Sequence, residues 1–424
     1  MRTSSINGRT RARATTKVMS VAVALVCAAA LAACGSDGNA GASGGKPGGS
    51  TSVDADPAAV AEVANKLFLT DVSVDDLDPA VQRTLEIAST EWTDQMQDKL
   101  MECLGKDVCE TGNDGYVIAF PNDNINPWRQ TFRAELTAQA IQSGRVSKII
   151  YSLGADVPTW LANFKSLIAQ RPDLIVIDSI YGPAILPALQ QAKSAGITVV
   201  NVETPLPEEV AGLVDVQATS DLCAFYEAAA ADAVELAGED QTYGLYTGVP
   251  GNGSAAVWQP CAEDALKSAG WSKSIEGFTQ WTPQGMTQEG TALFASDKNP
   301  TAVLYDYTME YFADPFIKAD KTPPIMISDV VNSAYLGQSK DAVDAGVDVQ
   351  GLIANGRSWY GRIGLTAGLM LKDGEDVKQQ VDIPYPSAQL SDVVAGFDSS
   401  MPANAPVPTM FDAEQEAGIL GAGS

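Results

Sequence analysis

From residue 116 onward, short apolar runs rich in β-branched residues alternate with longer stretches whose apolar positions recur every three or four residues. The short runs predict buried strands, and the longer pattern predicts amphipathic helices. The predicted helices at 184–196 and 255–270 both end in glycine, as helix C-termini commonly do. The predicted strands are 116–120, 148–153, 174–179, 198–203, 213–219, 243–248, 274–280, 302–306, 324–329 and 349–355.

This alternation of strands and helices predicts the fold class. Nearly continuous apolar strands are typical of parallel sheets covered by helices on both faces. Ten strands exceed one ordinary domain, so we expect an α/β fold of two doubly wound parallel-sheet lobes. Open parallel sheets bind ligands at the carboxyl ends of their strands. Polar residues stand at or near those ends: Asp178, Glu203, Asp306, Asp329 and Asn355.

The first 33 residues have a basic start and a short apolar core, which predicts an export signal rather than a membrane span. The core ends in LAAC, which resembles a bacterial lipobox. That resemblance implies cleavage before Cys34, a lipid on its sulfur, and contact with the membrane through this lipid only.

Two further segments precede the alternating region. Residues 34–56 are rich in glycine and serine and predict a flexible linker. Residues 57–112 have helical periodicity and predict a helical preface of about two elements. Within the preface, Asp78 before Pro79 indicates a helix start.

Charge and composition exclude several function classes. The chain contains no histidine, which removes Ser-His-Asp and Cys-His catalysis and the commonest metal ligand. Loss of the leader, with its five basic residues, would leave a formal net charge of −31. Such acidity argues against nucleic acid and against anionic lipid surfaces. The spacing of a calcium loop is absent, and nothing pairs two carboxylates as a glycosidase requires. We therefore expect a binding protein rather than an enzyme, without metal or cofactor.

Disulfides are expected because the protein is predicted to be exported. With one cysteine in the leader and Cys34 as the lipid site, four cysteines remain, and they allow three pairings. We favour Cys103–Cys109, which closes a small loop, and Cys223–Cys261, which would join the first turns of two neighbouring helices.

Several local sequences resemble one family in both order and spacing. They are Asn-Pro-Trp at 126–128, the βαβ stretch 171–203, ATSD at 218–221, and GLIAN at 351–355 leading into a helix. Together they resemble the type I periplasmic binding proteins that deliver sugars to ABC transporters, the ribose/galactose/xylose group. The resemblance covers about 114–390.

The resemblance implies two lobes joined by three crossings, near 219–221, 355–357 and 383–387. The N-terminal lobe would comprise 113–220 and 356–384. We assign 221–355 and 385–424 to the C-terminal lobe and tail, although the tail after 390 lies outside the resemblance.

The resemblance also implies a ligand cleft between the lobes. Trp128 and Trp281 would form aromatic walls, one from each lobe. Polar side chains would contact hydroxyl groups at the rim, because sugars offer an apolar ring face surrounded by hydroxyls. These polar side chains would be Asn126, Asp178, Glu203, Asp329 and Asn355, with Tyr307 where an asparagine is usual.

The sequence departs from the family pattern at two arginine positions. Thr204 follows the acid of the fourth strand, and Val257 and Trp258 stand where a second arginine is usual. Arg129 is the candidate to supply the missing guanidinium, and Trp258 remains a candidate for the cleft.

We expect a monomeric, lipid-anchored, extracytoplasmic receptor that passes a monosaccharide or polyol to an ABC transporter permease. A cationic ligand, such as a polyamine or amino sugar, is an alternative, because several acids meet in one cleft with tryptophans. A signalling partner instead of a permease is a second alternative, and a carboxylate-based hydrolase is the least favoured.

Overall fold

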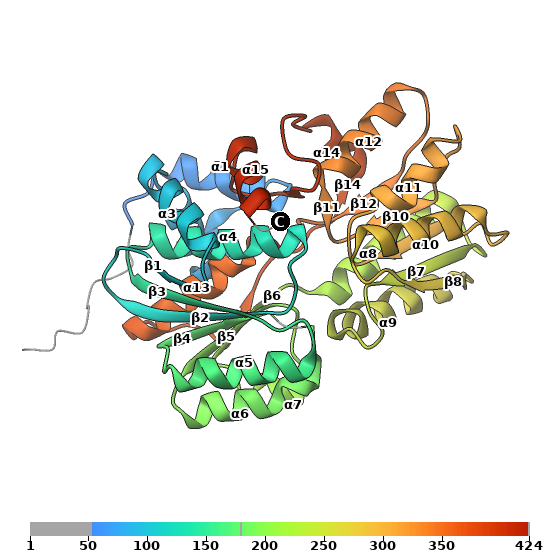
Figure 1. Ribbon diagram of the computed structural model, residues 1–424. Helices are drawn as coiled ribbons and strands as arrows, with labels where there is room; N and C mark the ends of the chain where they lie inside the picture. The colour runs from blue at the N-terminus through green and yellow to red at the C-terminus, as the bar shows by residue number, and fades with distance from the viewer. Residues whose placement is uncertain (1–52, 179, 423–424) are drawn as a thin grey trace, which may run out of the picture. The chain divides into compact units, whose positions relative to one another are not determined.

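The computed structural model describes residues 53–178 and 180–422 (Figure 1). The predicted leader, the predicted lipid site Cys34 and most of the predicted linker lie outside these residues. Within the described ranges, no helix is both long and apolar enough to cross a membrane.

A seven-stranded sheet forms the first lobe, in the order β1-β3-β2-β4-β5-β6-β13 (Figure 1). Strand β1 runs antiparallel to β3, and the other neighbours run parallel. The strands are β1 Val108–Glu110, β2 Tyr116–Asn122, β3 Val146–Leu153, β4 Leu174–Ile177, β5 Thr198–Glu203, β6 Val216–Thr219 and β13 Gln380–Asp382.

Helices cover both faces of this sheet, which explains why a strand such as β4 is apolar and buried along its whole length. Helix α13 lies very close to the sheet, because a Cβ at Gly364 would come within 2.1 Å of the Val202 side chain. One face carries α4 Pro127–Gln142 and α13 Tyr360–Asp373; the other carries α5 Val157–Ala169, η2 Gly182–Ile185, α6 Leu186–Ser194 and α7 Glu208–Ala211.

A six-stranded sheet forms the second lobe, in the order β14-β12-β10-β9-β7-β8. Strand β14 is antiparallel to β12, and the other neighbours are parallel. The strands are β7 Thr242–Thr247, β8 Ser272–Phe278, β9 Ala302–Tyr305, β10 Ile325–Ser328, β12 Gly351–Ile353 and β14 Ala388–Gln389. The helices are α8 Leu222–Ala237, α9 Gly253–Ser268, α10 Pro283–Ala295, α11 Glu310–Ile317, α12 Ser333–Asp344 and α14 Leu390–Ala395.

The chain passes between the two sheets after β6, after β12 and after β13. All ten predicted strands are present, with ends shifted by up to three residues. The predicted fold class, two doubly wound lobes joined by three crossings behind a helical preface, is therefore confirmed.

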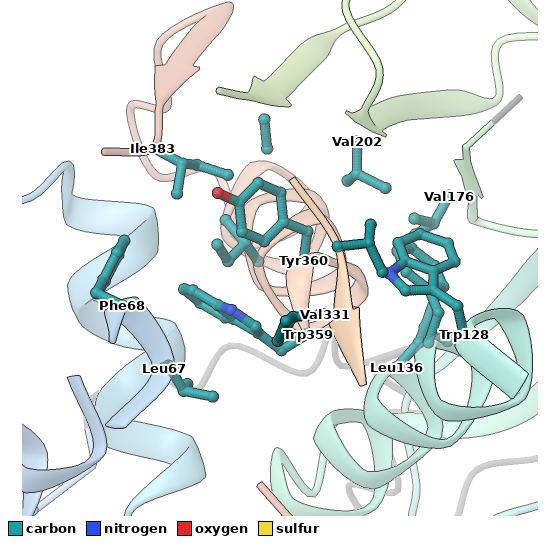
Figure 2. Close-up of a cluster of buried hydrophobic side chains, with 14 of the residues drawn as sticks. Leu67, Phe68, Trp128, Leu136, Val176, Val202, Val331, Trp359, Tyr360 and Ile383 are labelled. Atoms are coloured by element: carbon teal, nitrogen blue, oxygen red, sulfur yellow. The ribbon is translucent and has the colours of Figure 1, made fainter. Parts of the chain in front are cut away.

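The preface packs against the first lobe. Its elements are α1 Pro57–Phe68, η1 Val74–Asp76, α2 Pro79–Ala88 and α3 Asp94–Leu104. As predicted, Asp78 caps α2, and its side chain accepts a hydrogen bond from the Ala80 N–H at 3.1 Å. Phe68 meets Trp359 edge to face, with ring centroids 5.2 Å apart (Figure 2). The preface is not entirely helical, because 108–110 pairs with β3 as an edge strand of the sheet.

The tail does not stay with the second lobe, to which the sequence assigned it. Strand β15 (Pro406–Val407) pairs with β11 (Val331–Asn332) of that lobe. Helix α15 (Ala413–Ala422) then packs on α3 of the preface and on α4 of the first lobe. The physical reason is an apolar cluster in which Phe411 and Ile419 pack with Ala134 and Ala138 of α4.

Both expected disulfides form. Cys103–Cys109 joins α3 to β1, and Cys223–Cys261 joins α8 to α9. Cys223 lies in the first turn of α8, as expected, but Cys261 lies in the third turn of α9, which begins at Gly253.

Candidate functional site

A cavity lies between the two lobes, next to the carboxyl ends of strands from both sheets. It contains about 530 Å³ of space, counted out to its open mouth. This is the edge where open parallel sheets place ligands. Its lining residues are Asp123, Asn124, Asn126, Trp128, Arg129, Ile180, Glu203, Thr204, Asn252, Ser254, Trp281, Asp306, Tyr307, Val330 and Arg357.

The first lobe contributes Trp128 in the first turn of α4. Asn126 caps this helix, and its side chain accepts a hydrogen bond from the Arg129 N–H at 2.9 Å. The Trp128 ring stacks on Phe132 with centroids 5.3 Å apart, and its Nε1–H donates to the Gly356 carbonyl at the second crossing. The tryptophan is therefore held on one ring face and at its polar edge, so its orientation is fixed by the protein.

The second lobe contributes Trp281, in the turn between β8 and α10. Its ring lies against Gly248, where an added Cβ would come within 2.0 Å of it. Its Nε1–H donates to Asp306 Oδ1 at 3.1 Å. Tyr307, which follows β9 of the same lobe, also lines the cavity. The cavity is thus walled by aromatic rings from both lobes.

Arg129 is clamped between two carboxylates of its own lobe. Its Nε–H donates to Asp123 Oδ1 at 3.0 Å, and its Nη1 forms an ion pair with Asp178. Burial raises the pKa of Asp178 well above its usual range, although the Arg129 charge opposes that rise. The guanidinium is buried, with its charge matched on two sides.

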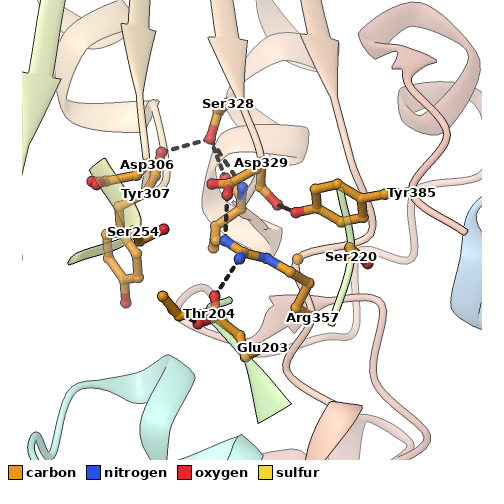
Figure 3. Close-up of polar contacts among 12 residues, drawn as sticks. Glu203, Thr204, Ser220, Ser254, Asp306, Tyr307, Ser328, Asp329, Arg357 and Tyr385 are labelled. Atoms are coloured by element: carbon orange, nitrogen blue, oxygen red, sulfur yellow. Dashed lines mark hydrogen bonds and ion pairs between the residues drawn. The ribbon is translucent and has the colours of Figure 1, made fainter. Parts of the chain in front are cut away.

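Arg357 occupies an equivalent clamp at the second crossing. It forms ion pairs with Glu203 of the first lobe and with Asp329 of the second lobe (Figure 3). The second oxygen of Glu203 accepts a hydrogen bond from the Thr204 hydroxyl. Burial raises the pKa of Asp329 to about 6, and the Arg357 charge opposes the rise. This arginine therefore joins the two lobes through side-chain charge as well as through the backbone.

Asp306, at the end of β9, is the most fully hydrogen-bonded acid in the wall of the second lobe. It accepts hydrogen bonds from Thr247 Oγ1 at 2.5 Å, Asn252 Nδ2 at 2.9 Å and Trp281 Nε1 at 3.1 Å. Burial raises its pKa to about 7. The hydrogen bonds orient the carboxylate and tie it to the Trp281 wall.

Most of the residues predicted for the site lie together. Asp178 and Asp329 do not line the cavity; they stand behind it as partners of the arginines. Asn355 is buried at the crossing, where its side chain accepts a hydrogen bond from the Arg357 N–H at 3.3 Å. The predicted residues that do line the cavity are Asn126, Trp128, Arg129, Glu203, Trp281 and Tyr307.

Trp258 does not reach the cavity, so its predicted place in the cleft is wrong. Its ring is fully buried and stacks on Tyr226 of α8, with centroids 4.0 Å apart. The reason is helical position: Trp258 faces α8 within the core of the second lobe.

Some lining residues were missed by sequence reasoning, although weak signals were present. Asn252 is the N-cap of α9 within the glycine-rich turn after β7. Asp306 was noted as a strand-end acid without a role. Asp123 stands three residues before Asn126, and Arg357 stands two residues after Asn355. Within the described ranges, no group of three or more His, Cys, Asp or Glu side chains is arranged to hold a metal ion.

Two doubly wound lobes, three crossings and a cavity between them define the class of two-lobed solute receptors with the type I periplasmic binding fold. Residues 116–376 match the family model of the periplasmic binding protein domain. The chain belongs to this family.

Solved structures agree on the fold. The binding protein of the arabinose ABC transporter from Shewanella sp. ANA-3 is 16% identical, with a TM-score of 0.59, over 66% of this chain and 94% of that one. An ABC transporter solute-binding protein from Thermobispora bispora is 20% identical (TM-score 0.58; 68% and 90% covered). One from Bacillus halodurans with bound myo-inositol is 13% identical (TM-score 0.58; 67% and 98% covered). No curated protein sequence matches the chain.

Proposed function

We propose that the protein is an extracytoplasmic receptor that captures a monosaccharide or similar polyol between its lobes and passes it to an ABC importer permease. The observation that carries this proposal is the pair of tryptophans, Trp128 and Trp281, that reach one cavity from opposite lobes. Aromatic faces suit the apolar faces of sugar rings, and the polar groups between them suit hydroxyls. The arabinose and myo-inositol bound by structural neighbours are ligands of this chemical kind.

In the proposed mechanism, the ligand stabilises the closed arrangement of the lobes. Both lobes contribute lining residues, so a ligand in contact with Trp128 and Trp281 together favours closure over opening. The closed form is then the one recognised by the permease, and the protein acts as a monomer.

A cationic ligand is the second candidate, and the acids of the cavity favour it. Asp123, Glu203 and Asp306 line the cavity, against two arginines. A polyamine or amino sugar would gain attraction to these carboxylates and cation–π contact with the tryptophans. A signalling partner in place of a permease would use the same cavity.

A thermal-shift screen over neutral sugars, polyols, amino acids and polyamines tests the ligand class. Stabilisation by a neutral sugar or polyol is the expected result. A response to amines with no response to any sugar would replace the proposal with the cationic alternative.

Binding of the best compound is then measured for Trp281→Ala and Trp128→Ala. We expect each change to weaken binding at least tenfold, because each removes one stacking face (about 1.4 kcal/mol per tenfold). Trp92→Ala is the matched control, because Trp92 is a half-buried tryptophan of the preface outside the cavity. Unchanged affinity in both cavity variants would refute the stacking walls.

We also propose that Cys34 carries the lipid that holds the receptor at the cell membrane. Cys34→Ala in the full-length chain is expected to move the protein from the membrane fraction to the soluble fraction and to abolish metabolic labelling with palmitate. Persistent labelling would refute lipidation at this residue.

A further inference from the structure

Both guanidinium groups of the cavity are already paired with carboxylates. Arg129 contacts Asp123 and Asp178, and Arg357 contacts Glu203 and Asp329. Proteins that bind carboxylated or phosphorylated ligands commonly present guanidinium groups in a two-point arrangement. Here protein carboxylates occupy those positions, so neither arginine offers an uncompensated charge to a ligand.

The cavity and the residues directly behind it contain more carboxylates than guanidinium groups. Two guanidiniums face five carboxylates, which gives −3 when all are ionised. Burial raises the pKa of three of these acids, and with those three protonated the total is zero. The five are Asp123, Asp178, Glu203, Asp306 and Asp329.

Hydrogen-bonding capacity remains even though the charge is offset. Arg357 is only 2% exposed and lines the cavity, yet its Nε–H has no hydrogen-bond partner among the described residues. A buried donor without a partner is costly. A hydroxyl group brings no charge to the paired arginines, so the arrangement suits uncharged hydroxylated ligands better than anions.

Resting on the proposed function, we infer that Asp123 and Glu203 determine specificity by making the cavity reject carboxylated and phosphorylated sugars. Each lines the cavity and neutralises one arginine. A ligand carboxylate would have to displace one of them from its arginine or remain unpaired beside it. Either event costs free energy that a neutral sugar does not lose.

Isothermal titration calorimetry on the wild-type protein tests this selection with paired probes. D-Galactose is compared with D-galacturonate, and D-glucose with D-glucuronate, at neutral pH. We expect any neutral sugar that binds to do so at least about tenfold more tightly than its uronate, as expected for an uncompensated charge beside buried carboxylates. A uronate that binds as tightly as its neutral partner would overturn the inference.

Two isosteric variants test the assigned residues. Glu203→Gln leaves Arg357 with one carboxylate instead of two, and Asp123→Asn does the same for Arg129. We expect affinity for the uronate to rise about tenfold relative to the neutral sugar in at least one of them. Glu208→Gln is the matched control, because it removes an equal charge from an exposed glutamate of the same lobe and should change nothing.

The two proposals fail in different ways. If both variants fold, bind the neutral sugar and gain no relative affinity for the uronate, the specificity assignment is wrong while the receptor function stands. If the wild type responds to no neutral sugar or polyol in the thermal-shift screen, the proposed function is wrong.

Discussion

The tail of the chain contains a buried acid whose ionisation should set the pH dependence of stability. Glu416 on α15 is fully buried, and its carboxylate accepts hydrogen bonds from the Thr131 and Thr409 hydroxyls. Burial raises the pKa of Glu416 to about 7, and the negative charge of Glu135 adds to the rise. The hydrogen bond from Thr131 and the positive charge of Lys66 both lower the pKa of Glu416. Glu135 is itself paired with Arg362.

The sign and size of the effect follow from linkage. An acid whose pKa is raised on folding supports the folded state while it is protonated, so its contribution is complete below the unfolded pKa. That contribution is lost as the pH rises from about 4.5 through about 7. The difference of about 2.5 pKa units corresponds to about 3 kcal/mol, of which about 2.5 kcal/mol falls between pH 5 and pH 8. Glutamine at this position cannot ionise and should not show the loss.

Urea unfolding of the wild type and of Glu416→Gln at pH 5 and pH 8 measures this difference. We expect the variant to gain about 2.5 kcal/mol relative to the wild type between the two pH values. Glu414→Gln is the control, because Glu414 is an exposed glutamate of the same helix. Its unfolding free energy should change between pH 5 and pH 8 by the same amount as that of the wild type. A Glu416→Gln protein that gains nothing between pH 5 and pH 8, or that loses stability, would refute the reasoning.

Three further predictions concern the second lobe. Replacing Cys223 and Cys261 by serine should cost about 4 kcal/mol of unfolding free energy, measured by urea denaturation, because their link closes a loop of 38 residues. Gly248→Ala should weaken ligand binding in calorimetry, because its methyl group would displace the Trp281 ring. Trp258→Ala should cost about 3–5 kcal/mol of stability, since it removes a fully buried ring, but should leave the affinity for a bound sugar within about twofold.

Controls and contrary outcomes separate these effects. Gly212→Ala is the control for Gly248→Ala, because an added Cβ there has no neighbour within 4 Å; equal ligand affinity in the two variants would contradict the proposed support of Trp281. Unchanged stability after both cysteines are replaced would contradict a structural role for that link. A Trp258→Ala protein that binds sugar as weakly as Trp281→Ala would indicate that Trp258 lines the cavity after all.

The strand pattern was predictable because the core strands are apolar over their whole length. In β4 and β10 all four residues are buried, so each strand is visible without knowing its partners. Strands such as β11, β14 and β15 have only two residues each, and their existence depends on the partner strand rather than on their own composition. The path of the tail was missed for the same reason. Ile419 is an ordinary apolar residue in the sequence, and nothing there identifies α4 as the helix on which it packs.

The location of the site could be predicted from the sequence, but the contacts among its side chains could not. Strand ends located the polar residues. Sequence spacing could not separate Asp178, which backs an arginine, from Asp123, which lines the cavity beside the same arginine. That distinction depends on side-chain ion pairs, which link residues distant in sequence.

The tail also limits how the two lobes can move. Val407 pairs with Val331 of the second lobe, while the Thr409 hydroxyl donates to Glu135 of the first lobe at 3.0 Å. Only Pro408 lies between these two residues, so their Cα atoms can be at most about 7 Å apart. A hinge movement that separates β11 from α4 by more than this span allows must break one of the two attachments. The lobes can therefore open widely at the Trp128 side only if the hinge axis passes close to the tail, or if the tail detaches.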